Sequence, residues 1–198
     1  MLKRFGIVTL AVLWSVSTAF ASVTETVKKT VDDVIQIVSD KEMKKKSNEQ
    51  QRRTAINKSI ATIFDSQEMA KRALGKHWNP RTPAERKQFV ELFATLLENS
   101  YAGKIESYNN EKVVYTKEIV DGEYAEVKSK VVTSKRDEYA LDYKLMKTES
   151  GKWMVYDVVI EGVSLVANYR TQFNKIIIAN GYPELVKKLQ VKSKEIKM

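Results

Sequence analysis

Two side chains in this 198-residue sequence could support acid–base or nucleophilic chemistry, and each also has a structural interpretation. His77 is the only imidazole, and it stands beside Trp78 in a connection between two predicted helices. A Ser–His pair would need this residue, but a loop histidine next to tryptophan is typical of a surface or packing residue. Asp157 interrupts an otherwise apolar strand, and a buried carboxylate must be paired, hydrogen-bonded or protonated. It could be the acid–base group of a cone-shaped α+β enzyme, although the favoured role is structural, with Arg170 or a tyrosine as its partner.

Other patterns that carry chemistry are missing from the sequence. It contains no GxSxG, HExxH, P-loop or GxGxxG pattern, and no two acidic residues are spaced for paired-carboxylate catalysis. With no cysteine and one histidine, a cysteine-rich or multi-histidine metal site and a disulfide framework are both excluded. We therefore predict that the protein is not an enzyme and carries neither metal nor cofactor.

The first 21 residues have the pattern of a cleavable secretory signal. Lys3 and Arg4 form a basic start, residues 5–16 are apolar, and Ala19-Phe20-Ala21 provides the small-x-small cleavage pattern. The apolar run is too short for a stable membrane-spanning helix, and no lipid-bearing cysteine follows it, so an N-terminal membrane anchor is only the less favoured alternative. We expect a soluble, exported protein that begins at Ser22 and forms a single domain over residues 22–198.

The net positive charge of the chain indicates which classes of molecule it could bind. Without Lys3 and Arg4, 32 basic residues face 25 acidic ones, a net charge of +7. Because export separates the protein from nucleic acid, the expected partners are anionic lipid headgroups or an acidic protein surface, with simple solubility as the alternative. The basic tail at about 192–198 belongs to this surface.

Hydrophobic periodicity predicts helices at both ends of the chain. Valines from Val23 to Val38 recur at helical spacing after a Ser22–Glu25 capping box, and residues 41–53 are expected to be a loop or a solvated helix end. Further helices are predicted around Ile56–Phe64, after Asp65, and from Thr82-Pro83 to Tyr108. Two more follow the strands, at about Leu165–Ala179 and from Pro183, with Gly181 between them.

Between these helices the period changes to two. Residues 112–120, 123–133, 138–148 and 152–161 read as four strands joined by hairpin-length turns. One face of the sheet is apolar and the other is polar and faces solvent, while the fourth strand is apolar on both faces. The fold class is therefore α+β, with a four-stranded antiparallel meander packed against a layer of helices.

Aromatic residues are concentrated in the second half of the chain. All nine tyrosines follow residue 100, and a long stripe of apolar groups runs from Phe89 to Tyr108. The stripe and the apolar sheet face either pack directly into a filled core or line a cavity with tyrosines at its mouth. Periodicity alone does not separate these two arrangements.

Colinear short motifs give the sequence a resemblance to a known family. Phe64-Asp65, Met69-Ala70, Leu74-Gly75-x-x-Trp78 and Thr82-Pro83 are followed by Phe89-x-x-x-Phe93, Leu96-Leu97-x-x-x-Tyr101, Trp153-x-Val-Tyr-Asp-Val158, Glu161-Gly-Val-Ser-Leu165, Asn168-Tyr169-Arg170 and Phe173. In this order, over nearly the whole chain after the signal, they resemble the MlaC, or toluene-tolerance, family.

The resemblance implies a periplasmic phospholipid carrier in a Gram-negative cell. Such a protein shuttles glycerophospholipids between an outer-membrane lipoprotein–porin complex and an inner-membrane ABC transporter with an MCE-domain partner, with transient proximity to membranes. This traffic maintains outer-membrane lipid asymmetry. The acyl chains are held in a deep cavity between sheet and helices. A periplasmic adaptor with a filled core and an enzyme using Asp157 remain the alternatives.

The family's cavity predicts three walls of lipid-binding residues in this sequence. The first wall has Phe93, Leu97, Tyr101 and Ile105; the second has Tyr139, Leu141, Tyr143 and Val155; the third has Val163, Val166, Tyr169 and Phe173. Asp157 and Arg170 are predicted as polar groups at the cavity mouth or as structural residues.

Overall fold

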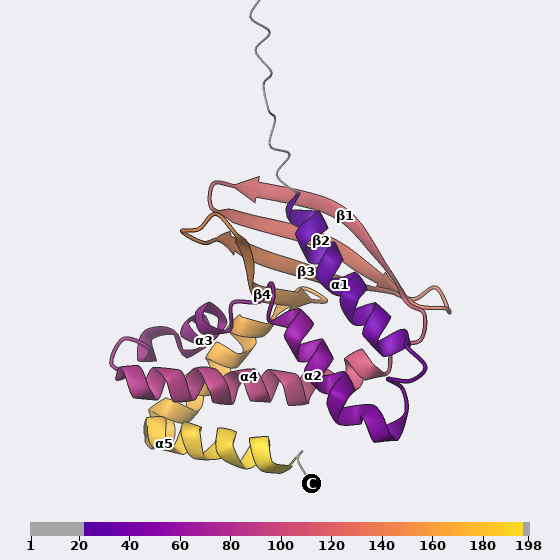
Figure 1. Cartoon of the computed structure of the whole chain (residues 1–198). Helices are drawn as coiled ribbons and strands as arrows, with labels where there is room; N and C mark the ends of the chain where they lie inside the picture. Colours follow the sequence, from indigo (N-terminus) through magenta and orange to yellow (C-terminus); the bar gives the residue numbers. More distant parts are fainter. Residues whose placement is uncertain (1–21, 196–198) are drawn as a thin grey trace, which may run out of the picture.

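The computed structural model describes residues 22–195, so the predicted signal peptide and the last three residues of the basic tail lie outside the described part. A twisted antiparallel sheet occupies one side of the molecule, and the helices gather on the other (Figure 1). This arrangement is the predicted α+β class.

The N-terminal helices agree with the prediction except at the end of the second one. α1 (Val23–Ser39) begins at Ser22, whose Oγ accepts from the backbone N–H of Glu25 at 3.1 Å. Residues 41–48 form turns, and the polar residues 49–53 are the start of α2 (Glu49–Ile60), so the stretch expected to be a loop or a solvated helix end contains both. Ile63 and Phe64, which were expected on this helix, lie beyond it.

Ile63–Asp65 instead pairs with a strand. The carbonyl of Ile63 accepts from the N–H of Val155 at 2.7 Å, and the N–H of Asp65 donates to the carbonyl of Val155 at 2.9 Å. This segment covers an otherwise open strand edge, and that long-range pairing outweighs the local helical pattern.

The next two helices follow their capping residues as predicted. α3 (Ser66–Leu74) starts where Asp65 Oδ1 accepts from the N–H of Glu68 at 2.8 Å, and it ends at Gly75. α4 (Pro83–Glu106) starts with a complete capping box, in which Thr82 and Glu85 exchange hydrogen bonds of 3.2 and 2.8 Å.

Within residues 22–195 the sheet has five strands rather than four, in the order β1-β2-β3-β4-β5 and antiparallel throughout. Their bounds are β1 (Lys112–Asp121), β2 (Tyr124–Val132), β3 (Glu138–Lys147), β4 (Trp153–Ile160) and β5 (Val163–Ser164). A two-residue turn joins β4 to β5, with positive φ at both Glu161 (49°) and Gly162 (77°). Two residues are too few to show a periodic pattern, so the sequence could not reveal β5.

Both faces of β4 are covered, as predicted. On the core face Val155 and Val158 are buried, and beyond a bulge at Tyr156 the opposite face contributes the buried Asp157. Along its outer edge, β4 pairs first with Ile63–Asp65 and then with β5.

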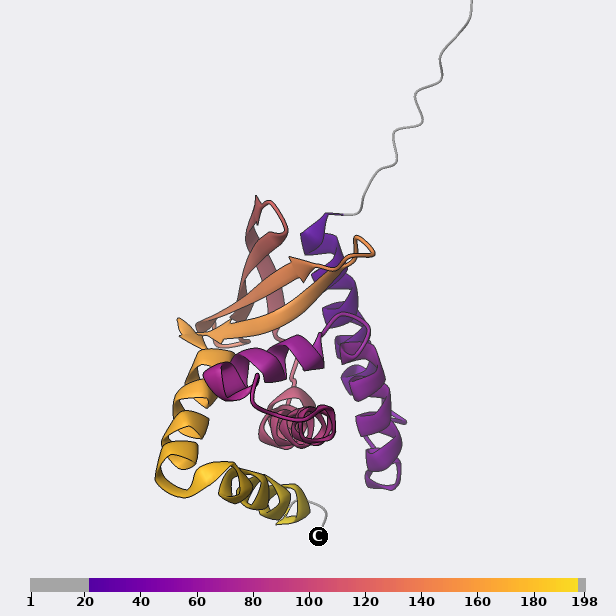
Figure 2. The ribbon, with the colours of Figure 1, turned by 90° about the vertical axis from the view of Figure 1, so that its left-hand side faces the viewer.

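α5 (Leu165–Glu195) is bent at Gly181, where φ is 81° and ψ is 167°. We call residues 165–180 the first arm and residues 182–195 the second arm. Figure 2 shows α4 end-on, with the first arm passing beside it and the second arm turning beneath it. The two C-terminal helices that the sequence predicted around Gly181 are therefore confirmed.

The apolar side chains form two clusters that meet at Phe64. The helical cluster joins α3, α4 and α5, with Phe89, Phe93 and Leu185 almost completely buried. The sheet cluster joins α1 to the sheet through Val27, Val127 and other residues. The seam between the clusters is where side chains of α4 and α5 approach the sheet.

Candidate functional site

The bend in α5 creates a groove of about 560 Å³ on the helical side of the molecule. This volume is in the range of about 300–1,000 Å³ that is usual for small-molecule sites. The apolar residues that line the groove come from α4 and both arms: Leu96, Tyr169, Phe173, Ile176, Leu185, Leu189 and Val191. The polar lining residues are Gln172, Glu184, Lys187, Lys188 and Lys192.

Aromatic packing fixes one end of the groove. Tyr169 and Phe173 are one helical turn apart on the first arm and stack at 5.6 Å between ring centroids. Both rings meet Phe93 of α4 edge-on, at 5.3 and 5.6 Å. Because Phe93 is 1% exposed, this wall is anchored in the helical cluster.

The polar rim of the groove is basic. Three lysines of the second arm oppose one carboxylate, Glu184, which is 3.5 Å from Lys188 Nζ in a surface ion pair. Such a pair contributes little because water screens it. The groove therefore combines an apolar floor with a net positive rim, an arrangement that suits an amphipathic, anionic ligand.

Tyr169 connects the groove to the seam between helices and sheet. The hydroxyl of Tyr169 lies 3.4 Å from Ser100 Oγ on α4. Tyr101, the residue after Ser100, packs against the sheet cluster. Burial raises the pKa of Tyr101, with a smaller contribution from Tyr169, so this hydroxyl stays protonated and can donate a hydrogen bond at physiological pH.

The predicted lipid-binding residues are divided between the two clusters. Phe93, Val166 and Phe173 are buried in the helical cluster, where Leu97 and Tyr169 are partly buried. Tyr143 and Val155 are buried in the sheet cluster, where Tyr101 and Leu141 are partly buried. Burial also raises the pKa of Tyr143.

The remaining three lie nearer to solvent. Ile105 is partly buried, whereas Tyr139 is 49% exposed and Val163 is 55% exposed. Of the twelve, only Tyr169 and Phe173 line the groove. The three-walled cavity between sheet and helices therefore stays a prediction.

Sequence reasoning missed most of the groove. Leu96, Ile176, Leu185 and Leu189 were visible as apolar positions, but nothing in their spacing gave the angle between the two arms. The available signal was Gly181 followed by Pro183, which indicates a helix break and leaves its direction open.

Asp157 is buried and hydrogen-bonded, with partners other than those predicted. Its Oδ1 accepts from the backbone N–H of Val166 at 3.0 Å, and its Oδ2 accepts from the hydroxyl of Ser164 at 2.5 Å. Ser164 Oγ in turn accepts from the N–H of Ala167 at 3.0 Å. Asp157 thus anchors the start of α5, and neither Arg170 nor a tyrosine is its hydrogen-bond partner.

Arg170 also lies away from the groove lining. Its side chain crosses Gly75, where a β-carbon would stand 3.1 Å from Arg170 Cδ. The Gly75 and Arg170 motifs of the sequence therefore meet at the junction of α3 and α5. His77, the only imidazole, has its Nε2 2.9 Å from Asn174 Oδ1, a hydrogen bond to the first arm of α5.

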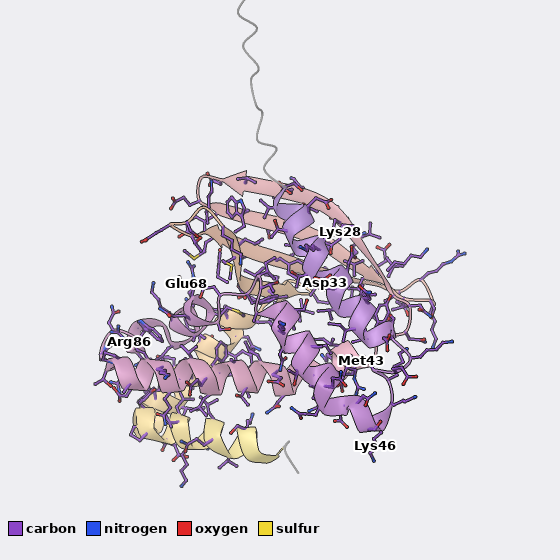
Figure 3. All side chains as sticks on the ribbon, in the orientation of Figure 1. Lys28, Asp33, Met43, Lys46, Glu68 and Arg86 are labelled. Atoms are coloured by element: carbon purple, nitrogen blue, oxygen red, sulfur yellow. The ribbon has the colours of Figure 1, made fainter. Side chains whose placement is uncertain are left out.

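Cation–aromatic contacts join the segment between α3 and α4 to α4 and to the second arm. The Arg86 guanidinium lies 5.3 Å from the ring of Trp78 and donates to the carbonyl of Trp78 at 3.3 Å; Figure 3 labels Arg86 at the start of α4. Arg81 similarly lies 4.6 Å from the ring of Tyr182.

Between residues 22 and 195 no group of three or more acidic, histidine or cysteine side chains is placed to hold a metal ion.

The chain is similar in sequence to two known proteins. It is 25% identical over 142 residues to the intermembrane phospholipid transport system binding protein MlaC of Haemophilus influenzae, an alignment that covers 70% of this chain and 66% of that relative, just under two thirds. It is 25% identical over 183 residues to the toluene tolerance protein ttg2D of Pseudomonas putida, covering 91% of this chain and 85% of the relative.

A solved structure agrees with these relatives. The phospholipid-binding protein of Ralstonia solanacearum, determined in complex with a phospholipid, superposes with a TM-score of 0.81 at 30% identity and covers 90% of this chain and 100% of that one. None of the helices described here combines the length and apolar character needed to cross a membrane. The sequence model of the MlaC protein family matches residues 28–191, and the chain belongs to that family.

Proposed function

We propose that this protein binds a glycerophospholipid and carries it through the periplasm between the outer and inner membranes. The observation that carries the proposal is the groove at the bend of α5, with its apolar floor and lysine rim, in a chain whose family relatives include a protein solved with a phospholipid. In this proposal, acyl chain packs on the floor near Phe173 and Ile176, and the phosphate meets the lysines of the second arm.

The energetics explain why such a carrier is needed. A buried methylene is worth about 0.8 kcal/mol, so exposing two acyl chains of about fifteen methylenes each to water costs about 24 kcal/mol. A carrier must replace that exposure with apolar contacts. The seam beyond Tyr169 offers further apolar surface, because Leu97, Tyr101 and Leu141 are only partly buried there. We propose that the chains extend from the groove into this seam.

Partners follow from the same proposal. The lipid would be exchanged with an outer-membrane lipoprotein–porin complex and with an inner-membrane MCE-domain ABC transporter, and the exported protein would act in the periplasm to maintain lipid asymmetry. The basic rim supports this role because it can approach anionic headgroups during transfer. No catalytic step is required, and both oxygens of Asp157 are already engaged at the start of α5.

The filled-core adaptor is the second candidate. The observation in its favour is the helical cluster itself, where Phe89, Phe93 and Phe173 are each no more than 3% exposed. An adaptor would have no stoichiometric lipid.

Native mass spectrometry of protein purified from the periplasm, followed by organic extraction of any adduct, separates the two candidates. The carrier is expected to hold phospholipid near one equivalent. Ile176→Asp places a charge in the groove and is expected to remove the adduct. Ile178→Asp is the matched control, because Ile178 is on the same arm, is 67% exposed and does not line the groove. Absence of lipid from the wild type, even after incubation with phospholipid vesicles, would refute the carrier; lipid retained by folded Ile176→Asp would refute the groove as its site.

A further inference from the structure

The first strand of the sheet has an unpaired edge. β1 is ten residues long and pairs with β2 on one side, and among residues 22–195 no strand pairs with its other side. Three apolar side chains on it are well exposed: Val114 at 45%, Ile119 at 36% and Val120 at 52%. In Figure 1 this strand forms the outer border of the sheet. A long edge with exposed apolar groups is a template for pairing with another strand.

A bulge at Thr116 determines which side chains share a face. Before the bulge Val113 lies opposite Val131, and after it Val120 lies opposite Ala125. Val131 and Ala125 are on one face of β2, so Val113 and Val120 also share that face. By the same reasoning Val114 and Ile119 share the other face, because their partners are Lys130 and Glu126.

This pattern makes β1 complementary to itself. We infer that the free edge of β1 pairs in antiparallel fashion with β1 of a second copy of this chain, and so joins two sheets about a twofold axis at Thr116–Lys117. In this register Val114 faces Ile119 of the second copy, and Val113 faces Val120. Both pairs are apolar, and the two side chains of each pair lie on the same face, as directly opposed residues of antiparallel strands must.

Charge supports the same register. Lys112 at one end of β1 faces Asp121 at the other end of the second strand, so each end carries an opposite-charge pair. Lys117 from each copy flanks the axis, and these like charges limit the affinity. An interface of one strand pair is small, so the dimer is in the class of weak, concentration-dependent contacts. This association is additional to the proposed lipid carriage and does not depend on it.

Cysteine cross-linking tests the register. The chain has no cysteine, so V114C/I119C introduces the only two thiols. Within one strand they are five residues apart, about 17 Å, and cannot join. Across the proposed pair they are direct neighbours, within reach of a disulfide. Mild oxidation is expected to convert the double variant, and neither V114C nor I119C alone, to a covalent dimer.

Sedimentation velocity over about 10–500 µM tests the association without cysteines. The wild type is expected to shift from monomer towards dimer, V114K to remain monomeric, and K117T to dimerise at several-fold lower concentration. Both substituted side chains are solvent-exposed, and circular dichroism confirms folding. A wild type that stays monomeric over the whole concentration range would overturn the inference. This is also the result expected if the edge of β1 pairs with a strand of another protein. A dimer unaffected by V114K, or a double variant that cross-links no faster than the singles, would also overturn it.

Discussion

Gly75 shows at the level of one residue why a family motif needs its glycine. Its backbone has a φ of 56° and a ψ of −128°, a conformation that only glycine adopts readily, and Arg170 lies directly above it. Gly75→Ala is expected to lower the free energy of unfolding by about 1–3 kcal/mol. The measurement is urea denaturation followed by circular dichroism.

Gly103 is the matched control for this substitution. It lies inside α4, and a β-carbon there would meet no atom within 4 Å. Gly103→Ala is therefore expected to raise the unfolding free energy by about 0.5–1 kcal/mol. Equal effects of the two substitutions would show that neither backbone strain nor the Arg170 contact matters at Gly75.

Individual roles were predictable only where a residue has few possible partners. The burial of Asp157 followed from one polar residue in an apolar strand. Its partners did not follow, because Ser164 and Val166 reach it only after the two-residue turn brings β5 beside β4. In the same way Arg170 was predicted to lie at the cavity mouth or to be a structural residue, and its position over Gly75 could not be predicted because it depends on how α3 meets α5.

At the scale of elements, one carboxylate binds the first turn of α1 to the sheet, in addition to the apolar contacts of the sheet cluster. Glu118 of β1 accepts from the N–H of Thr24 at 2.7 Å and from its hydroxyl at 2.5 Å. Burial alone would raise the pKa of Glu118, but the bonds from Thr24 and the N–H of Val23 outweigh it and lower the pKa below its usual value. The negative charge also faces the positive end of the helix dipole.

Glu118→Gln is therefore expected to loosen α1 in a pH-dependent way. Because the folded-state pKa is lowered, the stabilisation by Glu118 is complete above the unfolded value of about 4.3 and is lost as the pH falls through the folded value. Because Glu118 is exposed and water screens its charge, the variant should lose only about 0.3–0.5 kcal/mol at pH 7, and it should exchange its α1 amides faster, measured by hydrogen exchange. Near pH 3 the difference should narrow.

Glu126→Gln is the control for this prediction. Glu126 is on the opposite face of the neighbouring strand, 3.9 Å from Lys128, and should leave α1 exchange unchanged. A gap between wild type and Glu118→Gln that is equally large at pH 3 and pH 7 would contradict the charge-dependent contact.

Elements were predictable where their signals are local. α3 and α4 start at the residues that cap them, because a cap satisfies backbone groups within one turn. Ile63 and Phe64 were predicted on a helix, and β5 was not predicted at all. Both segments are fixed by pairing with β4, which lies about 90 residues after Phe64 in the sequence. Long-range pairing leaves no periodic trace in a two- or three-residue segment.

At the scale of the whole molecule, the class of fold and the family were recoverable from the sequence, whereas the groove was not. Its floor depends on the angle at Gly181, which brings Leu185 and Leu189 of the second arm under Leu96 of α4. Each of these residues has an ordinary core pattern. A concave surface arises from how packed elements are oriented, and hydrophobic spacing specifies only which face of each element is buried.

The proposed cargo should also stabilise the whole fold. A ligand that binds only the folded state at 100 times its Kd adds about 2.7 kcal/mol to the free energy of unfolding. For a chain of this size, that corresponds to a rise in Tm of about 5–11 °C. Protein stripped of lipid by organic solvent or detergent and refolded is therefore expected to melt at a lower temperature than the native preparation, and its Tm is expected to recover when phospholipid vesicles are added.

The two isoleucine variants are the controls for this measurement. Ile176→Asp should melt at one temperature with or without vesicles, while Ile178→Asp should behave like the wild type. A stripped wild type whose Tm does not respond to phospholipid would mean that the groove gains nothing from lipid, and the filled-core adaptor would then be the better account of the molecule.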